Sequence, residues 1–176
     1  MVKKRLLWYL NDCTEEKAGW AFDICIMVSE EVTERKDLFM ISARNQITGT
    51  VAEIREGAVN GIVKLDIAGG NQISATISME SIQALGLAVG KEATAVIKAT
   101  SVMMANGNLK ISARNQLNGT VSSIEEGAVN AIVKLDVADG VGITSTISME
   151  AVKDLGLAVG EKATAIIKAT SVMIAC

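Results

Sequence analysis

The chain has 176 residues, a formal net charge of −3 and neither histidine nor proline, and its apolar residues are mainly alanine, valine and isoleucine. Without histidine it lacks the usual near-neutral acid–base group and the commonest metal ligand. The acidic balance offers no broad basic surface for nucleic acid, and the apolar run near the start is too short to span a bilayer. We therefore expect a cytoplasmic protein with no membrane or nucleic-acid partner.

The three cysteines, Cys13, Cys25 and Cys176, are odd in number and widely spaced. They form no C-x-x-C pair, so the pattern predicts neither a zinc site nor a disulfide framework. No nucleophile stands beside a candidate base, and an enzyme is not expected.

Residues 1–40 form a leader whose composition differs from the rest of the chain. The leader holds every aromatic residue and two of the three cysteines, and Met40 stands directly before the first repeated segment. Two interpretations are open. Either the leader is an appendage whose apolar residues dock on the protein or a partner, or the native start is Met40 and the leader is upstream sequence.

The rest of the chain is a gapless internal repeat, which is the organising feature of the sequence. Residues 41–105 and 111–175 are identical at 45 of 65 aligned positions, and Asn and Gly mark the linker between them as a turn. The expected organisation is a leader, a first module, a linker and a second module, at residues 1–40, 41–105, 106–110 and 111–176.

Each module has the pattern of a small β domain. In chain order, the first module predicts a strand at 49–54, an alternating strand at 59–67, a hairpin connection at 68–71, a strand at 73–77, a short helix at 78–85 and a strand at 93–103. Gly86 follows the helix where a C-terminal cap belongs. The fold class expected is mainly β, with two tandem OB-like five-stranded β-barrels, each carrying one short helix.

The core of such a module is small, because residues 41–176 contain no Phe, Tyr or Trp. A domain of about 65 residues buries only about 60% of its unfolded surface and is marginal alone. We expect the modules to pack on one another within the chain and between chains, so that the protein is an oligomer.

Three polar clusters exceed what an apolar barrel needs. The first is the SARN segment with Ser42 and Arg44, for which a polar entry to the first strand, with Asn45 in a turn, is an equal alternative. The second is the helix start, where Ser78 is placed as the N-cap with Ser81 at the third helical position. Outward N–H groups and hydroxyls there also suit an oxyanion.

The third cluster is Lys98, a single ammonium in an apolar strand, for which a protective lysine on an edge strand is the alternative interpretation. Together the clusters supply hydroxyls, amides, one guanidinium and one ammonium, without a carboxylate pair. This is chemistry for holding a small anion without transforming it.

The sequence ISARNQ…GTV…EGAVN…VKLD…ISMES…LGLAVG…ATAVIKATSVM resembles the molybdate-binding Mop module of the molbindins. The resemblance covers each repeat from end to end, about three quarters of the chain. Two modules in tandem look like the di-Mop molbindins, which serve molybdenum storage and homeostasis.

The resemblance implies OB-like barrels, a homotrimer, and molybdate or tungstate held at module–module interfaces by hydrogen bonds and positive side chains, with no organic cofactor. It does not choose between the two anions. The oxyanion-binding residues carried over are Ser42, Arg44, Ser78, Ser81, the backbone N–H of Ile82, and Lys98, with Ser112, Arg114, Ser148 and Lys168 in the second copy. Because Ala151 replaces Ser81 in that copy, the two site halves are expected to be unequal.

Two other functions are weighed against storage. Mop pairs also serve as sensing modules, which in this case requires a separate partner to read the signal. An OB-type nucleic-acid binder needs stacking aromatics and a basic groove, which residues 41–176 do not offer.

Overall fold

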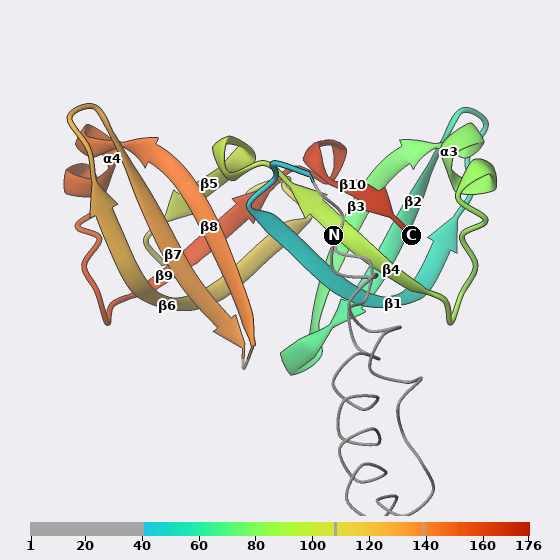
Figure 1. The fold of residues 1–176 in the computed structure, drawn as a ribbon, viewed down its shortest axis with the longest axis horizontal. Helices are drawn as coiled ribbons and strands as arrows, with labels where there is room; N and C mark the ends of the chain where they lie inside the picture. Colours follow the sequence, from blue (N-terminus) through green and yellow to red (C-terminus); the bar gives the residue numbers. More distant parts are fainter. Residues whose placement is uncertain (1–40, 108, 139) are drawn as a thin grey trace, which may run out of the picture. The chain divides into compact units, whose positions relative to one another are not determined.

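The computed structural model describes residues 41–107, 109–138 and 140–176 (Figure 1). The leader, residues 1–40, lies outside these residues, and so do both interpretations of it. The first module forms β1 (Asn45–Arg55), β2 (Asn60–Ile67), the 3₁₀ turn η2 (Ala68–Gly70), β3 (Asn71–Ser78), α3 (Met79–Ala84), β4 (Glu92–Ile97), the 3₁₀ turn η3 (Ala99–Ser101) and β5 (Val102–Ala105).

The second module repeats this order of strands and helix. It forms β6 (Asn115–Glu126), β7 (Asn130–Ala138), β8 (Val141–Ser148), α4 (Met149–Asp154), β9 (Lys162–Ile167), the 3₁₀ turn η4 (Ala169–Ser171) and β10 (Met173–Ala175). The mainly β fold expected from the sequence is confirmed, with five strands in each of two curled, antiparallel sheets.

The two modules exchange their last strands. One sheet has the order β10-β4-β1-β2-β3 and the other β5-β9-β6-β7-β8, so each takes its fifth strand from the other module (Figure 1). The single strand expected at 93–103 is instead two strands, because η3 redirects the chain after Lys98. The edge-strand interpretation of Lys98 is wrong, since the preceding strand β4 lies between β10 and β1.

Local sequence explains the turns that frame each sheet. Between β2 and β3, Gly69 has a φ of 73°, a left-handed conformation that glycine adopts without steric cost. Helix α3 begins at the predicted N-cap Ser78, whose hydroxyl accepts the Ser81 N–H at 3.1 Å. Gly86 follows the helix with a φ of 57°, as the predicted cap requires.

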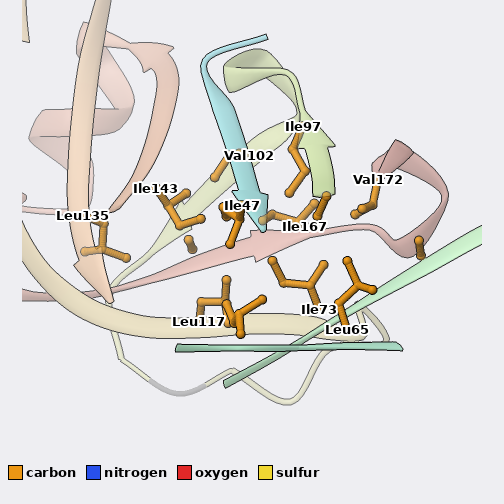
Figure 2. Packing of buried hydrophobic residues seen from close by; sticks show 14 of the residues in the cluster. Ile47, Leu65, Ile73, Ile97, Val102, Leu117, Leu135, Ile143, Ile167 and Val172 are labelled. Atoms are coloured by element: carbon orange, nitrogen blue, oxygen red, sulfur yellow. The ribbon is translucent and has the colours of Figure 1, made fainter. Parts of the chain in front are cut away.

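A single hydrophobic core runs through both modules (Figure 2). Its largest fully buried side chains include Leu65, Ile73 and Ile97 from the first module and Leu135, Ile143 and Ile167 from the second. Burying one such side chain stabilises the fold by about 1.5–3 kcal/mol. The expected packing of the modules on one another within the chain is confirmed, and the shared core supplies the burial that a lone module lacks.

Within the described part of the chain, no helix is long and apolar enough to cross a membrane.

Candidate functional site

The SARN segments lead directly into the first strand of each module. In the second copy Ser112 and Arg114 are exposed, whereas Asn115, the first residue of β6, is 1% exposed. Ser42, Arg44 and Asn45 repeat this pattern in the first copy. The alternation places the candidate anion ligands outside and the asparagine inside.

The lysines lie beside the SARN arginines because of strand register. Asn115, the first residue of β6, pairs with Ile167, the last residue of β9. Arg114 precedes Asn115 and Lys168 follows Ile167, so the two lie side by side at the ends of adjacent antiparallel strands. Lys168 then begins the turn η4, in which the Ser171 N–H donates to the Lys168 carbonyl at 2.9 Å. Asn45 and Ile97 pair in the same way, and they bring Arg44 beside Lys98.

A pocket of about 410 Å³ unites the second set with residues of the first module. Its lining includes Ser112, Arg114, Lys168 and Thr170, and the first module adds Thr76 from β3 and Met103 from β5. Among the residues that the structure describes, no acidic side chain lines it. Two cations and several hydroxyls thus surround one space between modules, an arrangement that suits a small oxyanion.

Two buried asparagines join the modules beside these residues. The Asn115 amide accepts the Ser74 N–H at 2.7 Å and donates to the Ser74 carbonyl at 2.9 Å. Asn45 binds the backbone of Thr144 in the same way, at 2.6 and 2.8 Å. The turn expected as the alternative at Asn45 is wrong, because this residue is the buried start of β1.

The helix-start residues lie apart from this pocket. Ser78 caps α3, and its hydroxyl lies 2.8 Å from that of Ser81; Ser148 caps α4 by accepting the Ala151 N–H at 3.1 Å. The Ile82 side chain is 5% exposed and belongs to the core. Helix capping accounts for Ser78 and Ser148 in the structure. A role in anion binding for Ser78, Ser81, Ile82 and Ser148 stays a prediction.

A carboxyl group with a shifted pKa lies on the first sheet, outside this pocket. Hydrogen bonds from Arg55 and then from Lys64, whose ammonium lies 2.6 Å from the carboxylate, hold the pKa of Glu53 below its ordinary value. In the described residues, no group of three or more histidine, cysteine, aspartate or glutamate side chains is arranged to hold a metal ion.

Sequence reasoning missed Thr76, Thr170 and Asn115 as parts of this region. Thr170 stands two residues after Lys168, and its hydroxyl was the available signal. Thr76 reaches the pocket only because β3 of the first module packs against η4 of the second. The strand exchange, and the choice of residues that meet across the modules, carry no signature in the sequence of one module.

Comparison with known proteins places this architecture in a family. The TOBE domain model matches residues 41–104 and 111–174. The chain is 62% identical over 66 residues to a probable molybdenum-pterin-binding protein of Haemophilus influenzae, covering 38% of the chain and 96% of that protein. It is 40% identical over 136 residues to the molybdenum transport protein ModE of Herbaspirillum seropedicae, covering 76% of the chain and 51% of ModE.

Among solved structures, the cytoplasmic molybdate-binding protein ModG with molybdate bound is 47% identical, with a TM-score of 0.74. The match covers 77% of this chain and 97% of the ModG chain. The chain spans about half the length of the ModE relatives that it matches. The chain belongs to the TOBE domain family, of which it carries two copies. The resemblance to tandem Mop proteins of the molbindin type is thereby confirmed.

Proposed function

We propose that the chain binds molybdate or tungstate between its modules and serves as a cytoplasmic store of the oxyanion. The pocket between the modules carries this proposal, because Arg114 and Lys168 face it beside the Ser112 hydroxyl and no carboxylate from the described part of the chain lines it. Guanidinium and ammonium groups make charge-assisted hydrogen bonds to oxyanions, and partial exclusion of water strengthens them.

The first module supplies an equivalent set. Arg44 and Lys98 flank the paired residues Asn45 and Ile97, and η3 packs against β8 of the second module. We therefore propose two inter-module sites per chain, one for each SARN segment. Release needs no chemical step, since bound anion falls with free anion by mass action.

The assembly proposed is a homotrimer, with the helix starts at chain–chain contacts. Large exposed apolar side chains recur at equivalent positions of the two modules, with Val59 and Val129 each 71% exposed and Val89 and Val159 at 65% and 64%. Burial between copies would remove such surface from water. In that setting the Ser78 and Ser81 hydroxyls, the Ile82 N–H and Ser148 complete a second class of oxyanion site.

Storage is favoured over sensing. ModG is matched over 97% of its length and is described as a molybdate-binding protein, whereas the ModE relatives are matched over about half of theirs. A nucleic-acid role has little support, because residues 41–176 contain no aromatic side chain for base stacking.

Equilibrium dialysis of the full chain against molybdate, with sulfate in large excess, tests the proposal. We expect saturable binding of more than one anion per chain, abolished when Lys98→Ala and Lys168→Ala are combined. A folded wild-type chain that binds no molybdate under these conditions would overturn it.

A further inference from the structure

At Ser74, the outer edge of β3 pairs with a side chain. β3 is the last strand of its sheet. The Asn115 amide takes both the N–H and the C=O of Ser74, at 2.7 and 2.9 Å, as a neighbouring strand would. With 1% of its surface exposed, Asn115 can make these bonds in only one place, so it fixes the second module against one residue of the first.

We call this pair of hydrogen bonds the Ser74–Asn115 bracket. In each module it lies next to the pocket lining along the sequence. Asn115 directly follows Arg114, and Thr76 lies two residues after Ser74 on β3. In an antiparallel ladder, alternate residues turn their backbone groups to the same side. Thr76 therefore turns its backbone groups to the same edge of β3 as Ser74, the edge at which Asn115 lies.

We propose that Asn115 is a positioning residue for the anion pocket, which it serves by holding Thr76 of one module at a fixed distance from Arg114 and Lys168 of the other. This inference rests on the proposed function of that pocket. Asn45 does the same for the first set, because it brackets Thr144, two residues before Thr146 on β8.

The bracket requires an amide. Asparagine offers one acceptor and two donors, whereas ionised aspartate offers acceptors alone. Asn115→Asp would leave the Ser74 carbonyl without its donor and set a carboxylate against it, with almost no change in side-chain volume. Asn115→Asp therefore displaces Thr76 from the charged side of the pocket and adds negative charge beside it.

The two brackets are unequally supported. Ser145, beside Thr144, donates its hydroxyl to the Val102 carbonyl at 2.6 Å and adds an inter-module bond. The equivalent position beside Ser74 is Ala75, which has no hydroxyl. The Asn115 bracket thus acts without that second bond, and its pocket depends more strongly on the asparagine.

The experiment is molybdate titration of the full chain by calorimetry for the wild type, Asn115→Asp, Asn115→Ser and Asn45→Ser. Val133→Ala, which opens the second module's core away from the bracket, is the control for general destabilisation. Global unfolding lowers the number of competent sites, whereas loss of positioning raises the Kd of sites that are still present. We expect Asn115→Asp and Asn115→Ser to weaken one site at least tenfold at unchanged stoichiometry, and Asn45→Ser to weaken its own site less.

A Kd equal to that of the wild type in a folded Asn115→Ser protein would overturn the inference, as would an equal loss of affinity in Val133→Ala. If Asn115→Asp does not fold, the serine variant decides. If the wild type binds molybdate and Asn115→Ser binds it with the same Kd, the inference fails and the proposed function stands. If the wild type does not bind molybdate, the proposed function itself fails.

Discussion

Met173, near the end of the second module, lies opposite Val96 of the first. The reciprocal pair joins Met103 of the first module to Ile166 of the second. Each sheet is therefore complete only when the other module is present. The modules share strands, core and asparagine brackets, and we expect them to fold as one cooperative unit.

Ile167→Ala tests this shared stability. Ile167 is 0% exposed and lies opposite both Asn115 and Val102. Truncating a buried isoleucine costs about 2–5 kcal/mol, and we expect one urea transition, followed by far-UV circular dichroism, to shift as a whole. The control Leu109→Ala, at a linker side chain 49% exposed, should stay within about 0.5 kcal/mol. Two separate transitions would contradict the shared core.

Ser145→Ala tests the extra bond between modules. Its hydroxyl is buried and donates to the Val102 carbonyl at 2.6 Å. Removal leaves a buried acceptor unpaired, and we expect a loss of about 1–3 kcal/mol in the free energy of unfolding. Ser122→Ala, which removes an exposed hydrogen bond to Asp136, is the matched control. Equal stability of the two variants would show that the inter-module bond contributes nothing.

Arg114→Ala tests the charge in the pocket. A hydrogen bond to a charged group contributes about 1.5–3 kcal/mol, so one site should bind molybdate roughly 10- to 150-fold more weakly. Lys153→Ala removes the same charge from helix α4, outside the pocket lining, and should leave affinity unchanged. If the two variants weaken binding alike, the anion responds to net charge alone and not to this pocket.

Glu53→Gln tests a pH-dependent contribution to stability. The Glu53 pKa is held below the ordinary value of 4.5 by Arg55 and Lys64 in the folded chain. A lowered folded pKa stabilises the protein above the unfolded value, and this contribution is lost as pH falls through the folded one. The Tm difference between wild type and Glu53→Gln should be present at neutral pH and shrink in acid. Glu56→Gln, in the adjacent turn, is the control. A difference that does not change with pH would contradict the assignment.

Features set by local sequence could be predicted. The period-2 pattern of residues 59–67 matches β2, and the serine and glycine around 78–86 match the caps of α3. These follow from backbone sterics and local hydrogen bonding, which neighbouring residues determine.

Features that depend on the exchange of strands between the modules could not be predicted. The SVM segments at 101–103 and 171–173, where β5 and β10 begin, are the same in both modules, so the pattern predicts a strand without deciding which sheet receives it. The same degeneracy hid the partners of Asn45 and Asn115, and it hid Thr76, which reaches the pocket only through contacts between modules. Arg114, Ser112 and Lys168 were found because their chemistry is local to each repeat.

The most direct test of the central claim is a crystal structure of the protein with tungstate, with the metal located by its anomalous scattering. We expect density between Arg114 and Lys168, within reach of Ser112 and Thr76 of the same chain. Anomalous density confined to the helix starts at Ser78 and Ser81, with the inter-module pocket free of tungsten, would contradict it.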